Sequence, residues 1–178
     1  MNKLKKITIL LLVTVFPLIG KSQFKASVGS EVTSALDDFS HYVSYGFGLS
    51  GGAEYNFTDK FGITAQLGYI YLIPEARYAS AFMMPMQGGL KFYIESKENG
   101  PYISPIIGAH KLSITTKDYV IQRQTIPEKT VTKTNASYGF GMGYLFRAKF
   151  DVSVRYNIIT DDDGNTSSYF GLRLAIEF

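Results

Sequence analysis

The chain has no cysteine among its 178 residues, and it has only two histidines. The lack of cysteine excludes a disulfide framework, a cysteine-ligated metal site and a thiol nucleophile. After residue 22, no apolar run approaches the roughly 17–25 residues that a transmembrane helix needs. If the mature chain lies in a membrane, it must cross as a closed barrel, because only helices and closed barrels satisfy every backbone hydrogen bond in lipid.

Residues 1–22 have the pattern of a cleaved signal peptide. Three lysines precede an apolar run from Ile7 to Ile19, and small residues, Gly20 and Ser22, stand where a signal peptidase requires them. We therefore expect a cut before Gln23, which leaves residues 23–178 as the barrel domain. A membrane anchor is the alternative, but the apolar run is too short to cross the hydrocarbon as a helix.

Export also changes the charge of the chain. The full sequence has 18 basic and 15 acidic side chains, and four of the lysines lie in the signal, so the mature chain carries a net charge of −1. The basic isoelectric point thus partly reflects the signal peptide. It gives no argument for a nucleic-acid partner, and we expect none.

The mature chain alternates apolar and polar residues with a period of two, as strands with one apolar face do. Eight segments show the pattern: residues 24–32, 44–57, 61–73, 82–94, 102–114, 136–146, 150–158 and 169–178. Their apolar phase contains no charged residue, whereas the other phase carries Lys25, Glu31, Glu54, Lys91, Lys111, Asp151, Arg155, Arg173 and Glu177. A lysine or arginine facing lipid costs about 2–4 kcal/mol at mid-membrane, so the apolar phase is expected to face lipid. A water-soluble barrel would show the reverse.

Charges of both signs inside a narrow barrel can pair with one another. We expect Glu54, Lys91, Arg155, Arg173 and Glu177 to form a structural network there, with the two glutamates as candidate partners of the two arginines. Glycines of the same phase would make room for these large groups, because an eight-stranded interior is only just wide enough for side chains. The run Gly139, Gly141 and Gly143 is interpreted in this way, since no helix follows it as phosphate binding would require.

Loop lengths and aromatic residues indicate the orientation. The connections alternate between long and short, and residues 116–133 form the longest. Outer-membrane barrels have short periplasmic turns and longer outer loops, so both termini are expected in the periplasm. Aromatic residues gather toward both ends of the segments, with Tyr102 in the group at the short-turn end, and this predicts two interfacial girdles.

The last segment ends on Phe178, and Gly–Tyr pairs occur at Gly68–Tyr69 and Gly143–Tyr144. With these features the chain resembles the small outer-membrane β-barrel domain family of OmpA-type and OmpX-type, porin-family-like barrels. The resemblance implies an all-β fold, an eight-stranded antiparallel up-and-down transmembrane barrel of the bacterial outer membrane. It also implies two partners, outer-membrane lipid and the insertion machinery that reads the terminal aromatic residue. It implies no particular activity.

No group of residues indicates a catalytic, cofactor or metal site. His110 is expected to face lipid near the outer end, where a lipid-acting enzyme would need it. However, Ser113 falls in the opposite phase and no acidic residue occupies a neighbouring outward position. Pro85 and Pro105 interrupt two segments and are expected to mark bulges.

The acidic sequence from Asp161 to Asn165 resembles the start of a calcium loop. The bidentate glutamate of such a loop is missing, because Leu172 stands at the twelfth position. An acidic turn is the preferred interpretation, and weak cation binding at the cell surface stays open.

The function is expected to lie in the outer loops. We predict a non-enzymatic barrel with a side-chain-filled polar interior, which acts through its surface loops or in membrane integrity. The alternatives are a lipid-modifying barrel enzyme and a narrow ion or solute channel. In the longest loop, Tyr119, Ile121 and Arg123 are candidate contacts for a surface protein, because a purely solvated loop would not need the apolar residues. Its flanks are expected to continue as a hairpin whose open edge can recruit a strand, and a disordered loop is the alternative.

Overall fold

The structure, a computed structural model, describes residues 23–75, 78–121, 124–126, 128–161 and 163–178. Nearly all of them lie in strands. The elements are β1 (Phe24–Leu36), the 3-10 helix η2 (Asp37–His41), β2 (Val43–Asn56), β3 (Phe61–Pro74), β4 (Tyr78–Tyr93), β5 (Gly100–Thr116), β6 (Tyr119–Ile121), β7 (Gln124–Ile126), β8 (Lys129–Phe146), β9 (Phe150–Thr160) and β10 (Thr166–Glu177). Among the described residues, no helix is long and apolar enough to cross a membrane.

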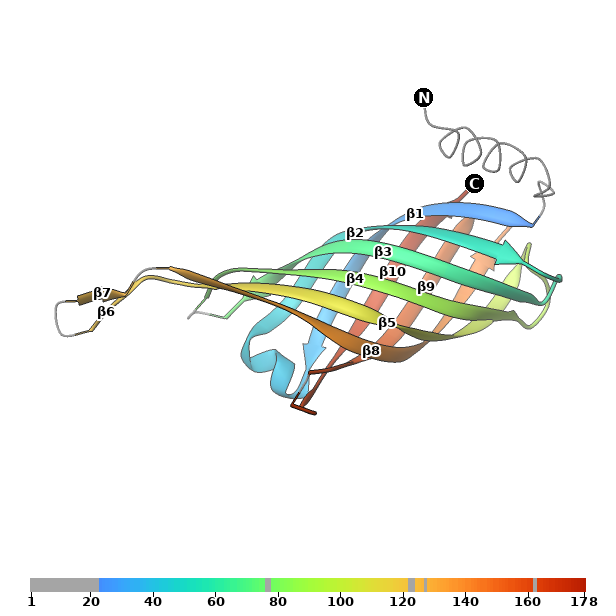
Figure 1. Cartoon of the computed structure of the whole chain (residues 1–178). Coiled ribbons are helices and arrows are strands. Elements are labelled where there is room, and N and C mark those ends of the chain that lie inside the picture. The colour runs from blue at the N-terminus through green and yellow to red at the C-terminus, as the bar shows by residue number, and fades with distance from the viewer. Residues whose placement is uncertain (1–22, 76–77, 122–123, 127, 162) are drawn as a thin grey trace, which may run out of the picture.

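Eight of the strands form a closed barrel in the order β1-β10-β9-β8-β5-β4-β3-β2, and each neighbouring pair is antiparallel. The last strand closes on the first through a register that runs from Ser27 opposite Glu177 to Leu36 opposite Ser168. The predicted fold class is therefore confirmed. The barrel is drawn in Figure 1, where β6 and β7 form a separate ribbon at the end opposite the C-terminus.

The alternation of side chains explains why these segments form a barrel. Outward residues such as Leu67 and Ile107 are 63% and 71% exposed, whereas inward charged residues such as Glu31 and Arg155 are buried. A barrel that turns its apolar side chains outward and buries its charges is stable only in lipid.

Three details of the strands differ from the sequence prediction. Pro85 and Pro105 lie within β4 and β5 without a shift of register, so they mark no bulge; the shifts occur between Val43 and Gly46 and between Tyr78 and Ser80. Each proline lacks only its own backbone donor, which the rest of a long ladder tolerates. The alternation of long and short connections also fails once, because β3 and β4 extend until only residues 75–77 separate them.

The interior is apolar at the end opposite the short turns, which is called the outer end below because the sequence predicts that it faces outward. Here η2 folds inward at the mouth and packs on inward residues of five strands, in a cluster of Phe39, Val43, Ile70, Leu72, Ala81, Met83, Ile159 and Tyr169. The hydroxyl of Ser168 on β10 donates a 2.7 Å hydrogen bond to Asp37 Oδ2 at the start of η2. The interior is thus filled as predicted, but its outer part is closed by hydrocarbon rather than by polar groups.

Candidate functional site

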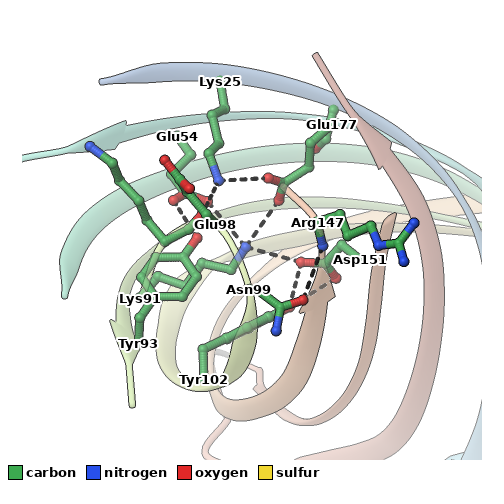
Figure 2. A network of polar contacts seen from close by, with 12 residues as sticks. Lys25, Glu54, Lys91, Tyr93, Glu98, Asn99, Tyr102, Arg147, Asp151 and Glu177 are labelled. Carbon is green, nitrogen blue, oxygen red and sulfur yellow. Dashed lines mark hydrogen bonds and ion pairs between the residues drawn. The ribbon is translucent and has the colours of Figure 1, made fainter. Parts of the chain in front are cut away.

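The short-turn half of the interior contains a cluster centred on Lys91. Its ammonium group lies 3.0–3.2 Å from three carboxylates, those of Glu54, Asp151 and Glu177. These residues come from β4, β2, β9 and β10, so one cation joins four strands across the barrel. Figure 2 shows the amine of Lys91 at the centre of this network, with Lys25 bound to Glu177 at its edge.

Two tyrosines complete the Lys91 cluster. The hydroxyl of Tyr93 donates a 2.5 Å hydrogen bond to Glu54, and that of Tyr102 donates to Asp151 at 2.8 Å. The Tyr102 ring centroid lies 4.2 Å from Lys91 Nζ, a cation–π contact. Tyr102 therefore points into the barrel, and its predicted place in the lipid-facing girdle is wrong. Its neighbour in space on β8 is Gly143, where a side chain would collide with the Tyr102 ring.

The turn between β4 and β5 closes the same end of the barrel. Lys25 Nζ donates a hydrogen bond to the carbonyl oxygen of Lys97, and Lys97 Nζ pairs with Asp59 of the β2–β3 turn at 3.3 Å. On the other side, the side-chain oxygen of Asn99 accepts a 3.2 Å hydrogen bond from the backbone nitrogen of Arg147, in the β8–β9 turn (Figure 2). These contacts thus connect the β2–β3, β4–β5 and β8–β9 turns to one another below the Lys91 cluster.

A second cluster, centred on Glu31 of β1, lies further toward the outer end. Glu31 Oε1 accepts a 2.7 Å hydrogen bond from Arg155 and lies 3.7 Å from Nε of Arg173. Arg155 also donates to Gln66 at 2.8 Å, and Arg173 donates to Ser50 at 2.9 Å. The two arginines thus share one carboxylate, and the predicted partnership with Glu54 and Glu177 is not what the structure shows.

The two clusters leave little space in the interior. The cavity between them has a volume of about 70 Å³, enough for a few water molecules, and residues of both clusters line it. Gly141 borders it, where a side chain would press on Arg155, so this glycine makes room for a large polar group as predicted.

Lys111 is not part of the interior. It was assigned to the inward phase, but it is exposed on the outer face of β5, because the alternation of β5 runs one residue out of step with the prediction. Without Lys111, the described residues of the interior include four basic ones (Lys25, Lys91, Arg155, Arg173) and four acidic ones (Glu31, Glu54, Asp151, Glu177), so these charges balance.

The same shift in the alternation of β5 turns His110 inward. Its side chain is fully buried inside the barrel, and its Nε2 lies 2.7 Å from the hydroxyl of Tyr169 on β10. Ser113 faces the other side of β5, where its hydroxyl lies 3.1 Å from that of Thr132. His110 therefore does not face lipid, as a histidine that acts on lipid would have to.

The outer end of the barrel carries a projecting ribbon. β5 and β8 remain paired as far as Thr116 opposite Lys129, and β6 pairs with β7 from Tyr119 opposite Ile126 to Ile121 opposite Gln124. The predicted hairpin is thus confirmed for these residues, and Figure 1 shows it extending well beyond the rest of the barrel. The candidates Tyr119 and Ile121 lie on β6, whereas Arg123 lies outside the described residues.

One edge of this ribbon has no neighbouring strand in the described part of the chain. β9 pairs with β8 only as far as Thr160 opposite Ala136, so Lys129–Asn135 of β8 are bonded to β5 alone. The other edge differs, because β4 follows β5 as far as Thr116. The Lys129–Asn135 segment is called the β8 edge below.

A pocket lies beside the β8 edge, at the mouth of the barrel. It has a volume of about 540 Å³, within the range typical of ligand pockets, and opens to the outside. Its apolar lining is Phe39, Tyr42, Leu112, Ile114 and Val131, and its polar lining is His41, Lys133, Asn135, Asp161, Asn165, Thr166 and Ser167. We call it the mouth pocket.

The β9–β10 turn forms the polar wall of the mouth pocket. Asp161 accepts hydrogen bonds from the side chain and backbone of Asn165 and from the backbone of Asp163, and these bonds hold the pKa of Asp161 below its ordinary value. Lys133 lowers this pKa further. Asp161 thus acts as the acceptor that shapes an acidic turn, and among the described residues no group of three acidic or histidine side chains is arranged to hold a metal ion.

Sequence reasoning missed Glu31 as the centre of one cluster and Asp151 as a member of the other, and it missed the mouth pocket entirely. The inward phase of the sequence contains both acids, but the pattern of strands does not say which charges meet across the barrel. The pocket depends on the position of η2 and on β9 ending at Thr160. Neither feature can be recognised from alternation of apolar and polar residues in the sequence.

Comparison with known proteins identifies the architecture. A family model described as "Outer membrane protein beta-barrel domain" matches residues 8–178. The attachment invasion locus protein Ail of Yersinia pestis is similar in structure, with a TM-score of 0.63 at 16% identity over 88% of this chain and 98% of that one. The N-terminal barrel domain of Pseudomonas aeruginosa OprF gives 0.62 at 13% identity, over 86% and 97% of the two chains.

Neisserial surface protein A is a further structural neighbour, with a TM-score of 0.59 at 12% identity over 86% of this chain and 95% of that one. At these identities the likeness shows the fold alone. No curated protein matches the sequence itself.

Proposed function

Since the chain belongs to the outer-membrane β-barrel domain family, we propose that it is a surface-recognition protein of the bacterial outer membrane. The barrel is the anchor, and the ribbon with its β8 edge is the binding element. The observation that carries the proposal is the seven-residue edge of β8 that lacks a partner strand in the described part of the chain. Such an edge offers a row of backbone donors and acceptors to an extended segment of another protein.

The interior supports binding rather than transport. The Lys91 cluster and the short turns close one end, the Glu31 cluster fills the middle, and the η2 cluster closes the mouth. The inward position of His110 likewise supports a non-enzymatic role. Assembly through the outer-membrane insertion machinery belongs to the same proposal, with the exposed aromatic Phe178, which follows β10, as a candidate contact.

A sulfated polysaccharide is a second candidate partner. Residues 111–133 contain five basic and two acidic side chains, so this part of the protein is strongly basic. The neighbour Ail has been solved in complex with a heparin analogue, sucrose octasulfate. A basic ribbon would bind such a polyanion in a strongly salt-dependent way, whereas strand pairing is less sensitive to salt.

We expect the purified barrel to show no single-channel conductance. The small internal cavity and the two closed ends leave no continuous path for ions. The measurement is electrical recording in planar bilayers, with a general porin as the positive control. Discrete, reproducible current steps from the pure protein would favour the channel alternative.

Deleting Arg123–Thr130 should abolish binding to cells or matrix proteins and leave the barrel intact. The deletion removes the far part of the ribbon and the first residues of the β8 edge. Folding is checked by the heat-dependent shift of the barrel on a gel, and binding is measured on cells that display equal amounts of each protein. If binding survives in a correctly inserted variant, the ribbon is not the recognition element.

A further inference from the structure

The mouth pocket lies where a continuation of β9 would run. β8 continues beyond its last pair with β9, Ala136 opposite Thr160, and its residues Val131 and Lys133 form one wall of the pocket. Thr166 and Ser167 of β10 line the pocket as well. The pocket therefore lies next to an open edge of β8, and a strand added at that edge would extend the barrel wall with its inward side chains in the pocket.

An added strand would direct every second side chain into the pocket, because side chains of a strand alternate between its two faces. The face of β8 that lines the pocket carries Val131, Lys133 and Asn135, and their partners on β5 include Ile114 and Leu112. A side chain at the centre of the added strand would thus meet an apolar floor to which Phe39 also contributes. This floor favours an apolar side chain at that position.

The charge of the β8 edge indicates which side chains should flank the apolar residue of the added strand. Lys129 and Lys133 both lie on this edge, four residues apart on the same face. Lysines on an edge strand disfavour pairing with uncharged or basic strands, a second copy of this ribbon included. Carboxylates on either side of the central apolar residue would pair with them, and the carboxylate opposite Lys133 would share this lysine with Asp161 of the pocket wall.

We infer that the mouth pocket is a specificity site for an acidic, extended peptide segment, which adds to the β8 edge and inserts one apolar side chain. The inference rests on the proposed function, since it requires strand addition at the same edge. It goes beyond it by stating the chemistry of the partner: an apolar residue that faces the pocket, with acidic residues two positions away on each side.

The test uses fluorescein-labelled seven-residue peptides and the full barrel in lipid nanodiscs, with binding followed by fluorescence anisotropy. The parent peptide has threonine at the outward positions and glutamate, leucine and glutamate at the inward ones. Replacing the leucine by asparagine, which is similar in size, should weaken binding by at least about tenfold. Replacing both glutamates by lysine should abolish it.

Two protein variants test whether the preference for leucine over asparagine arises in the mouth pocket. Val131→Trp fills the pocket from an exposed position and should remove most of the preference for leucine over asparagine. Thr132→Trp adds the same side chain to the opposite face of β8, where Thr132 is also exposed, and should leave the preference unchanged. Both variants must retain the heat-dependent gel shift of the folded barrel.

Peptides with N-methylated backbone amides separate the two proposals. Backbone amides of a strand point alternately to its two sides, so only every second amide of the peptide faces β8. Methylating the amides that face β8 should prevent binding, and methylating the others should not. If this alternation is seen but leucine and asparagine bind equally, strand addition stands and the pocket inference is wrong. If the parent peptide fails to bind, or binds without this alternation, or if the ribbon instead forms a dimer, the inference is overturned, and the deletion of Arg123–Thr130 remains the separate test of the proposed function.

Discussion

Lys91→Met should lower the free energy of unfolding of the barrel by about 3–5 kcal/mol, the range typical for removal of one partner from a buried ion pair. Lys91 is the cation that lies within 3.2 Å of three buried carboxylates. Methionine keeps much of the length of the side chain but leaves Lys25, which contacts Glu177, as the one remaining cation paired with these acids among the described residues. The measurement is urea-induced unfolding of the refolded barrel in lipid vesicles.

Two further variants show whether the loss is electrostatic. Lys60→Met, at an exposed lysine in a turn at the same end, should change stability by less than about 0.5 kcal/mol. Adding Asp151→Asn to Lys91→Met should restore part of the stability, because it removes one of the uncompensated charges and keeps an acceptor for Tyr102. If the double variant is no more stable than Lys91→Met, repulsion among the carboxylates is not the cause.

The barrel itself could be predicted from the sequence because lipid enforces a strict rule on each outward position. A charge there costs several kcal/mol, so the two phases of a strand separate cleanly wherever the interior is polar. This holds for β9, where Asp151 and Arg155 alternate with Val152 and Val154. The eight strands and their lipid-facing side followed from the same alternation, whereas the location in the bacterial outer membrane was implied by the resemblance to small outer-membrane barrels.

The rule fails where the interior is itself apolar. On β5, Leu112 and Ile114 face inward toward the η2 cluster, while Ile103 and Ile107 face outward toward lipid. Both phases of the segment then look apolar, and hydrophobicity cannot choose between them. The errors at His110, Lys111 and Tyr102 share this origin, since all three lie on β5.

Pairing across the barrel is also beyond a pattern of alternation. Residues that share a cluster are separated by up to 152 positions in the chain, as Lys25 and Glu177 are, and their meeting depends on the tilt and register of the whole sheet. Sequence reasoning placed Arg155 and Arg173 on neighbouring strands and inside the barrel, which the structure bears out. The identity of their shared carboxylate became clear only from the structure.

Glu31→Gln should also destabilise the barrel by about 3–5 kcal/mol, because it leaves two buried guanidinium groups without the carboxylate that they share. Glu98→Gln, at an exposed glutamate in a short turn, is the control and should have little effect. Unfolding by urea in lipid vesicles again measures the change.

Double-mutant cycles then show which of the two arginines is coupled more strongly to Glu31. The nitrogen of Arg155 lies 2.7 Å from Glu31 Oε1, whereas that of Arg173 lies 3.7 Å away and has Ser50 as a closer partner. The coupling energy between Glu31→Gln and Arg155→Gln should therefore exceed that between Glu31→Gln and Arg173→Gln. Strictly additive effects in both cycles would show that Glu31 does not hold the arginines together, and that the middle of the barrel is stabilised by packing and neutral hydrogen bonds instead.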